Sequence, residues 1–172
     1  MRYARTLLAL SLALVVGTAA ACTYKPRTVP PNTGQGTVNQ ARKYLEGKWS
    51  LVSFTVYPAT GAPIEMKGTG SLVYDDYNNM TMNLEADDAS AALLASIGIP
   101  MVKNRFSTAG KTLVDMQSRT LRYVLEGQHV SVTTGPMAIE RLRHWQVDGN
   151  TLTLTTKDDN GKPLSVGKWQ KQ

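Results

Sequence analysis

The sequence predicts an all-β fold, an antiparallel sandwich or barrel, and two observations carry this expectation. Short segments of alternating apolar and polar residues recur through the chain after residue 45, separated by turn signals at a spacing of roughly 8 to 12 residues. Asp148-Gly149 and Asn160-Gly161 are two-residue hairpin signals, because both pairs tolerate positive φ. Since such hairpins join antiparallel neighbours, the expected sheet is antiparallel.

The alternation is clearest in two segments. In "NMTMNLE", Met80 and Met82 alternate with polar residues, which is the period of a half-buried strand. In "GNTLTLTT", Leu152 and Leu154 share one face and the threonines share the other. "TLRYVL" and "HVSVTT" behave similarly. Each of these segments is expected to turn its apolar face toward a common core.

One segment, residues 86–100, predicts a helix between the strands. Asp87 or Asp88 can cap its beginning, an Ala- and Leu-rich body follows, and Gly98 and Pro100 end it, which gives a helix over about 87–98. Its apolar stripe either packs on the sheet or closes the mouth of a barrel, and packing is the simpler interpretation. The stripe consists of Leu93, Leu94 and Ile97.

The first 21 residues have the pattern of an export signal. Arg2 and Arg5 precede the uncharged run "TLLALSLALVV", and the small residues 19–21 follow. The uncharged stretch, residues 6–21, is shorter than the roughly 20 mainly apolar residues of a membrane span. We therefore expect a signal peptide over residues 1–21 rather than a permanent membrane helix.

The only cysteine of the chain, Cys22, follows this segment directly. Ordinary secretion would leave it as a free thiol without an intramolecular disulfide partner. Residues 19–22 also resemble the lipobox of bacterial lipoproteins, which implies that Cys22 carries a lipid such as palmitate and anchors the protein to a membrane. Under the same resemblance Thr23, which is not Asp, implies sorting to the periplasmic face of the outer membrane.

Residues 22–44 predict a flexible, Pro- and Gly-rich linker, and residues 45–172 a single domain. The formal net charge is +6, or +4 once residues 1–21 are removed. No run of five or six Lys and Arg residues forms a nucleic-acid patch, so nucleic acid is not an expected partner. Protein partners cannot be read from the sequence.

Three stretches resemble bacterial lipocalin-like domains, which have a calycin-type β-barrel. They are "LEGKWSLVSFTV" with its Gly47-x-Trp49 motif, "GTGSLVYDDYNNMTMNL", and the C-terminal "RHWQVDGNTLTLTTKDDNGKPLSVGKWQK", whose aromatic and basic ending is Trp169 and Lys171. The resemblance implies a small up-and-down antiparallel barrel of about eight strands with one short inserted helix. Gly47, Trp49, Trp169 and Lys171 would then form a structural plug, with the cationic stem of Lys171 or Lys168 across the ring of Trp49.

A barrel of this size can enclose one small ligand, so the expected function is binding of a small hydrophobic or amphipathic molecule. Methionine adapts to apolar partners of different shape, which adds to this expectation. The alternative is a filled barrel that serves as an envelope interaction or structural module. Alternation selects these candidates for the ligand-binding wall: Tyr74, Met80, Met82, Tyr123, Leu152 and Leu154.

The segment "IERLRHWQV", residues 139–147, is ambiguous because neither face is purely apolar. If one face points inward, Glu140 and His144 enter the barrel and join the candidate ligand-binding residues. If the other does, Arg141 and Arg143 enter it. A buried arginine without a partner is costly, so the arginines either face water or meet an anionic ligand. Exposure to water is the simpler expectation.

No motif in the chain points to catalysis, a metal or a cofactor. His129 and His144 lie on different expected strands without a metal-ligand pattern. There is no G-x-S-x-G elbow, and "KGTGS" lacks the context of a dinucleotide loop. A non-enzyme without cofactors is expected. For the less favoured alternative, a small barrel enzyme, the residues to inspect are Glu140, His144 and Tyr123.

Overall fold

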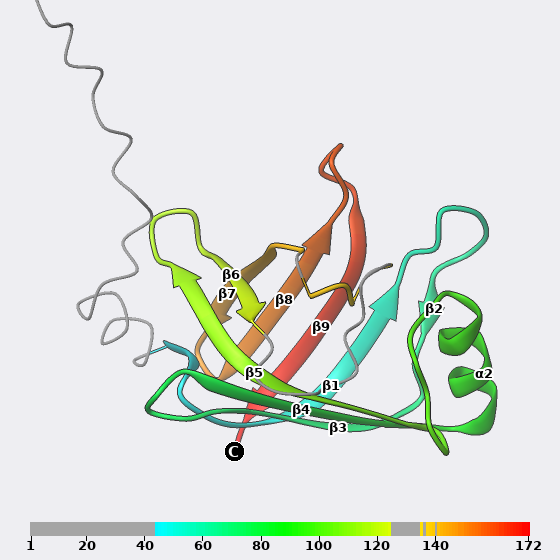
Figure 1. Ribbon diagram of the computed structural model, residues 1–172, viewed down its shortest axis with the longest axis horizontal. Helices are drawn as coiled ribbons and strands as arrows, with labels where there is room; N and C mark the ends of the chain where they lie inside the picture. Colours follow the sequence, from blue (N-terminus) through cyan, green and yellow to red (C-terminus); the bar gives the residue numbers. More distant parts are fainter. Residues whose placement is uncertain (1–43, 125–134, 136, 140) are drawn as a thin grey trace, which may run out of the picture.

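The computed structural model describes residues 44–124, 135, 137–139 and 141–172, in which eight antiparallel strands close into a barrel (Figure 1). Each strand pairs with the next along the ring, and the last pairs with the first. A two-residue strand, β2 (Ile64–Glu65), adds to the end of β1. The predicted all-β antiparallel barrel is confirmed. The ring consists of β1 (Gly47–Val56), β3 (Gly68–Tyr74), β4 (Asn79–Ala86), β5 (Arg105–Asp115), β6 (Thr120–Val124), β7 (Arg143–Asp148), β8 (Thr151–Lys157) and β9 (Pro163–Lys171).

The core lies inside this ring, as the alternating pattern predicts. On β4 the side chains of Met80, Met82 and Leu84 are buried and those between them are exposed or half-buried. Strand β8 repeats this pattern with Leu152 and Leu154. Because neighbouring side chains of a strand point to opposite faces, one register places every apolar side chain of such a segment inside.

The Gly47-x-Trp49 motif opens β1, where the ring of Trp49 is 1% exposed. Its indole Nε1 donates a hydrogen bond of 2.8 Å to the carbonyl oxygen of Leu45. Nζ of Lys171, which is paired with Trp49 across β1 and β9, lies 5.3 Å from the centroid of the ring. A Cβ atom on Gly47 would lie 3.1 Å from Cε of Lys171, so glycine leaves room for this stem. The contact between Trp49 and Lys171 is the one expected from the sequence.

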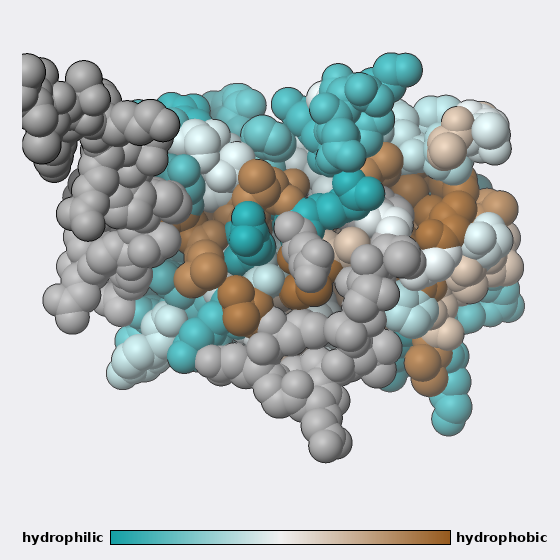
Figure 2. Space-filling model, turned by 45° about the horizontal axis from the view of Figure 1, so that its top comes forward, coloured by the Kyte–Doolittle hydropathy of each residue, from teal (hydrophilic) through white to brown (hydrophobic). Residues whose placement is uncertain are grey.

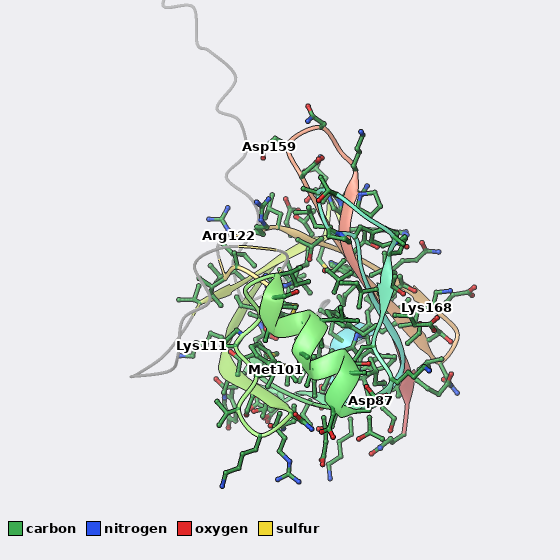
Figure 3. The ribbon with its side chains drawn as sticks, turned by 90° about the vertical axis from the view of Figure 1, so that its right-hand side faces the viewer. Asp87, Met101, Lys111, Arg122, Asp159 and Lys168 are labelled. Carbon is green, nitrogen blue, oxygen red and sulfur yellow. The ribbon has the colours of Figure 1, made fainter. Side chains whose placement is uncertain are left out.

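The predicted helix is present as α2 (Asp88–Ser96). Asp87 caps it by accepting a hydrogen bond of 2.7 Å from the backbone N–H of Ser90, and Gly98 follows with a positive φ of 85°. The hydroxyl of Ser90 in turn accepts a bond of 3.0 Å from the backbone N–H of Lys67, which ties the helix to the chain just before β3. Figure 3 shows α2 in front of the strands, so it lies across one end of the barrel.

The apolar stripe expected on this helix is only partly correct. Leu94 is fully buried and Ile97 is half-buried, but Leu93 is 49% exposed. The buried face instead runs through Ser90, Ala91 and Leu94, which are spaced as residues on one side of a helix must be. The helix therefore packs with a narrow, partly polar face.

Candidate functional site

Strand β7 turns the opposite face inward from the one expected. Arg143 and Trp145 are buried, at 3% and 5% exposure, whereas His144 is half-buried on the outer side. The expectation that the arginines face water is wrong for Arg143, and His144 does not enter the barrel. The physical reason is the large ring of Trp145. Side chains two residues apart on a strand point to the same face, so burial of this ring also turns Arg143 inward. Arg141 is half-buried and its Nε donates to the carbonyl oxygen of Gly135 at 3.1 Å.

The guanidinium of Arg143 is held by main-chain oxygens. Nη1 donates to the carbonyl of Arg141 at 2.9 Å, and Nη2 donates to those of Met137 and Ala138 at 3.2 Å each. Its Cζ lies 4.3 Å from the centroid of the Tyr123 ring, a close cation–π contact. Within the part of the chain that the structure describes, none of its hydrogen-bond partners is a carboxylate.

Two tyrosines extend this polar group across the interior. The hydroxyls of Tyr74 and Tyr123 are 2.9 Å apart, and both side chains are 3% exposed. Burial raises the pKa of Tyr74 well above its ordinary value and also raises the pKa of Tyr123, where the nearby charge of Arg143 acts in the opposite direction. Burial lowers the pKa of Arg143, and the two tyrosines oppose this. Both phenols are therefore neutral at neutral pH, and Arg143 keeps its charge because a guanidinium does not lose its proton in proteins.

Two further side-chain polar atoms are buried without a hydrogen-bond partner among the described residues. They are Oγ1 of Thr112 and Nε1 of Trp145. Thr112 is the cross-strand partner of Tyr123, and Trp145 follows Arg143 on the same face of β7. The sequence reasoning missed Thr112 and expected the face of Arg143 and Trp145 to meet water. The available signal was the strict alternation of "KTLVD", which puts Thr112 on the same face as Val114.

All six residues expected to line the interior are buried, and each points inward from its strand. Thr112, Tyr123 and Arg143 lie on β5, β6 and β7, between the apolar faces of β4 and β8, and Tyr74 reaches Tyr123 from β3. Cys22 and Glu140 lie outside the described residues. His144 faces outward and Tyr123 faces inward, so these two residues do not lie together as members of one catalytic group would. The six, with their exposed fractions, are Tyr74 (3%), Met80 (0%), Met82 (4%), Tyr123 (3%), Leu152 (0%) and Leu154 (7%).

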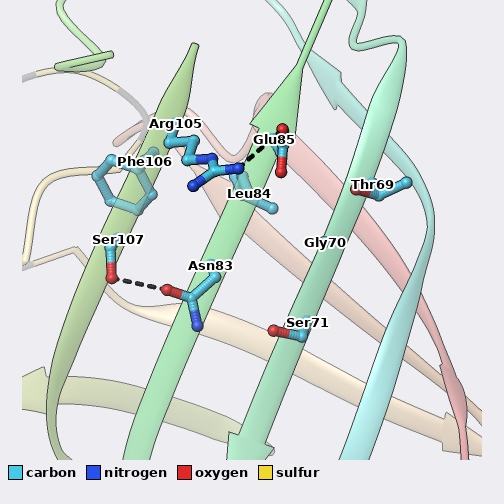
Figure 4. A pocket seen from close by; sticks show the side chains of 9 residues that line it. All are labelled: Thr69, Gly70, Ser71, Asn83, Leu84, Glu85, Arg105, Phe106 and Ser107. Carbon is cyan, nitrogen blue, oxygen red and sulfur yellow. Dashed lines mark hydrogen bonds and ion pairs between the residues drawn. The ribbon is translucent and has the colours of Figure 1, made fainter. Parts of the chain in front are cut away.

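One hollow of about 490 Å³ lies on the outer wall over β3, β4 and β5 (Figure 4). Most of the residues that line it have polar side chains, and Figure 4 shows that these side chains rise from three adjacent strands. Ser107 donates to Asn83 at 2.7 Å, and Arg105 pairs with Glu85 at 3.2 Å. Among the described residues, no side chain that lines this hollow is a buried polar group without a hydrogen-bond partner.

A second hollow, of about 500 Å³, lies on the outer wall over β5, β6 and β7. Leu113 and Leu142 contribute exposed apolar surface to it, at 47% and 45% exposure. His144 also lines it, and partial burial followed by the charge of Lys157 lowers the pKa of this imidazole. On the face drawn in Figure 2, hydrophobic residues form separate patches interrupted by hydrophilic ones.

Comparisons with protein-family models, curated proteins and solved structures found no match for this chain. Among the described residues, no helix is long and apolar enough to cross a membrane, and no three His, Cys, Asp or Glu side chains form a group that could hold a metal. The closed eight-stranded antiparallel barrel is consistent with a calycin-like fold.

Proposed function

We propose that the barrel binds a small hydrophobic or amphipathic molecule in its interior, as a lipocalin-like protein would. The observation that carries this proposal is the composition of the inner wall. Flexible Met80 and Met82 and rigid Leu152 and Leu154 provide apolar surface, and polar side chains stand on the strands between them. Ligand sites in proteins typically combine such an apolar lining with a few well-placed polar groups.

The test is titration of the purified domain with a twelve-carbon amphiphile, followed by calorimetry. Met82→Trp should weaken binding at least tenfold, because the larger ring occupies interior volume that the ligand needs. Thr81→Trp is the matched control, since this residue is the next one on β4 and faces outward. If no amphiphile binds below about millimolar, or if both variants bind equally well, the ligand-binding function is wrong.

The location of the protein is a second part of the proposal. Export by residues 1–21 and a lipid on Cys22 would hold the domain at the cell envelope through the linker of residues 22–44. Support comes from the order of charged, apolar and small residues before a lone cysteine. Mass spectrometry of the mature N-terminus should find acylated Cys22 as the first residue, and Cys22→Ser should abolish the modification. An unmodified cysteine, or a start elsewhere, would refute the anchor.

The outer hollow over β5–β7 favours a second candidate function, an interaction module. Leu113 and Leu142 expose apolar side chains on the outer wall of the barrel. The fold itself does not require apolar residues at these outward positions. A photo-reactive amino acid at position 113 should then give one defined adduct in the producing cell, and Leu142→Glu should abolish it. The same probe at Thr81 is the control. Adducts of equal yield at both positions would exclude this candidate.

A further inference from the structure

We propose that the outer wall of the barrel over β5–β8 docks on a membrane surface that carries anionic lipids. The contact is made by one row of four outward side chains, here called the docking row: Leu113, Arg122, Leu142 and Lys157. This inference goes beyond the proposed function, because it concerns the outside of the barrel and requires neither a ligand in its interior nor a lipid on Cys22.

The strand register places these four side chains next to one another. Leu113 is the cross-strand partner of Arg122 on β5 and β6. Continued by one residue, the register of β6 and β7 places Leu142 opposite Arg122, and that of β7 and β8 places Lys157 opposite Leu142. Neighbouring strands are about 4.8 Å apart, so the row is roughly 14 Å long. Apolar and cationic side chains therefore alternate along one line of the outer wall.

Apolar side chains gather on this wall. Leu113 and Leu142 are 47% and 45% exposed and line the hollow of about 500 Å³, and Val124, the next outward residue on β6 after Arg122, is 42% exposed. Single exposed apolar residues are common on soluble proteins, but a group of them marks a surface that contacts a partner or a membrane. The outward side chains of β4, by contrast, are polar: Asn79, Thr81, Asn83 and Glu85.

The charged side chains of this wall are mainly cationic. Arg122 and Lys157 are exposed, and Lys111, the cross-strand partner of Val124, adds a third cation beside the row. Asp115 is the one carboxylate among the described residues that line the hollow, and it accepts hydrogen bonds from the backbone of its own turn. The positive charge disfavours a second copy of the same wall as the occupant, because like charges would meet, and it favours an anionic one.

A membrane with anionic lipids matches both properties of the row. Its headgroups supply negative charge, and its acyl chains receive apolar side chains just below them. Arginine and lysine bring their charged ends to the headgroups while their aliphatic stems lie on apolar surface, so Arg122 can act between the two leucines. The described part of the chain also begins beside β7, where the ring of Tyr44 lies 5.7 Å from that of Trp145. An N-terminal tether would therefore hold the domain by the side that includes β7.

The test is co-sedimentation with vesicles of the mature chain, residues 22–172, in which Cys22→Ser prevents attachment of a lipid. Vesicles of phosphatidylglycerol and phosphatidylcholine in equal parts should bind it at least about tenfold more tightly than vesicles of phosphatidylcholine alone. Loss of one Lys or Arg near an anionic surface lowers affinity about fivefold, so Arg122→Gln and Lys157→Gln should each weaken binding by that factor. Lys168→Gln is the matched control, because Lys168 is exposed on the opposite side of the barrel from Arg122 (Figure 3).

The apolar members of the row are tested separately. Leu113→Ser and Leu142→Ser should each weaken binding to the mixed vesicles about fivefold or more. Leu93→Ser, which replaces a similarly exposed leucine on α2, should leave this binding unchanged. Since all of these side chains are exposed, the variants should fold like the wild type.

The docking row is refuted if the chain binds neither kind of vesicle, if it binds both equally well, or if the control variants lose as much affinity as those of the row. A dimer without vesicles that Leu113→Ser dissociates would assign the wall to a second copy, and a protein adduct at position 113 without vesicle binding would assign it to a protein partner. Either result overturns the inference. Met82→Trp faces inward and should bind vesicles like the wild type, so failure of the row and failure of the interior ligand site are distinguishable.

Discussion

Truncation of Trp49 should show how much this side chain, near the start of β1, contributes to the stability of the barrel. The ring is 1% exposed, donates to the carbonyl of Leu45, and lies under the ammonium of Lys171. Trp49→Ala removes apolar volume, that hydrogen bond and that contact at once. Truncation of a core Trp costs about 3 to 5 kcal/mol, and a domain of this size has a free energy of unfolding of about 5 to 15 kcal/mol. The variant should therefore lose a large part of its stability.

The separate contributions can be measured with two milder variants. Trp49→Phe keeps a ring but leaves the buried carbonyl of Leu45 without its donor, so it should cost about 1.5 to 3 kcal/mol. Lys171→Met keeps the aliphatic stem and removes the charge, so it should cost about 0.5 to 1 kcal/mol. Lys168→Met is its control, since Lys168 is exposed on the same strand.

Urea unfolding followed by far-ultraviolet circular dichroism is the suitable assay, because the substitution removes one of the three tryptophans that fluorescence would report. A loss below about 1.5 kcal/mol for Trp49→Ala would refute the reasoning, since core Trp truncations cost more than that. The cation–π argument would be refuted if Lys171→Met and Lys168→Met have the same free energy of unfolding.

Two further predictions concern the backbone and the pH dependence. Gly68→Ala should cost about 2 to 4 kcal/mol, because its φ is 155° and a Cβ atom would lie 2.0 Å from the carbonyl oxygen of Glu85; Gly61→Ala, with open space around the new atom, should cost only about 1 to 2 kcal/mol, and equal losses in urea unfolding would contradict this. Because the folded-state pKa of His144 is lowered from 6.5, the unfolded chain binds its proton more tightly, so stability should fall as the pH drops below about 6.5. His144→Gln should flatten this part of the profile of unfolding free energy against pH, and an unchanged profile would contradict the prediction.

Most of the fold could be predicted because its determinants are local. The alternation around Met80 and Leu152 depends only on the two-residue period of a strand, and Asp87 and Gly98 bound the helix through their own backbone geometry. Leu93 shows the limit of such reasoning. The apolar content of a helix does not determine which side of it meets the barrel, because that depends on where α2 crosses the strands.

The polar interior could not be predicted for a similar reason, because it depends on tertiary contacts between distant segments. When β7 is considered alone, burial of Arg143 has a high free-energy cost, and burial of His144 on the other face has a lower one. The cost changes only when distant segments are assembled, because the carbonyls of residues 137, 138 and 141 and the ring of Tyr123 then surround the guanidinium. Thr112 and Trp145 remain without partners even after that assembly. A buried polar atom without a hydrogen bond costs about 1 to 3 kcal/mol, so the fold gives up stability at each of these two positions.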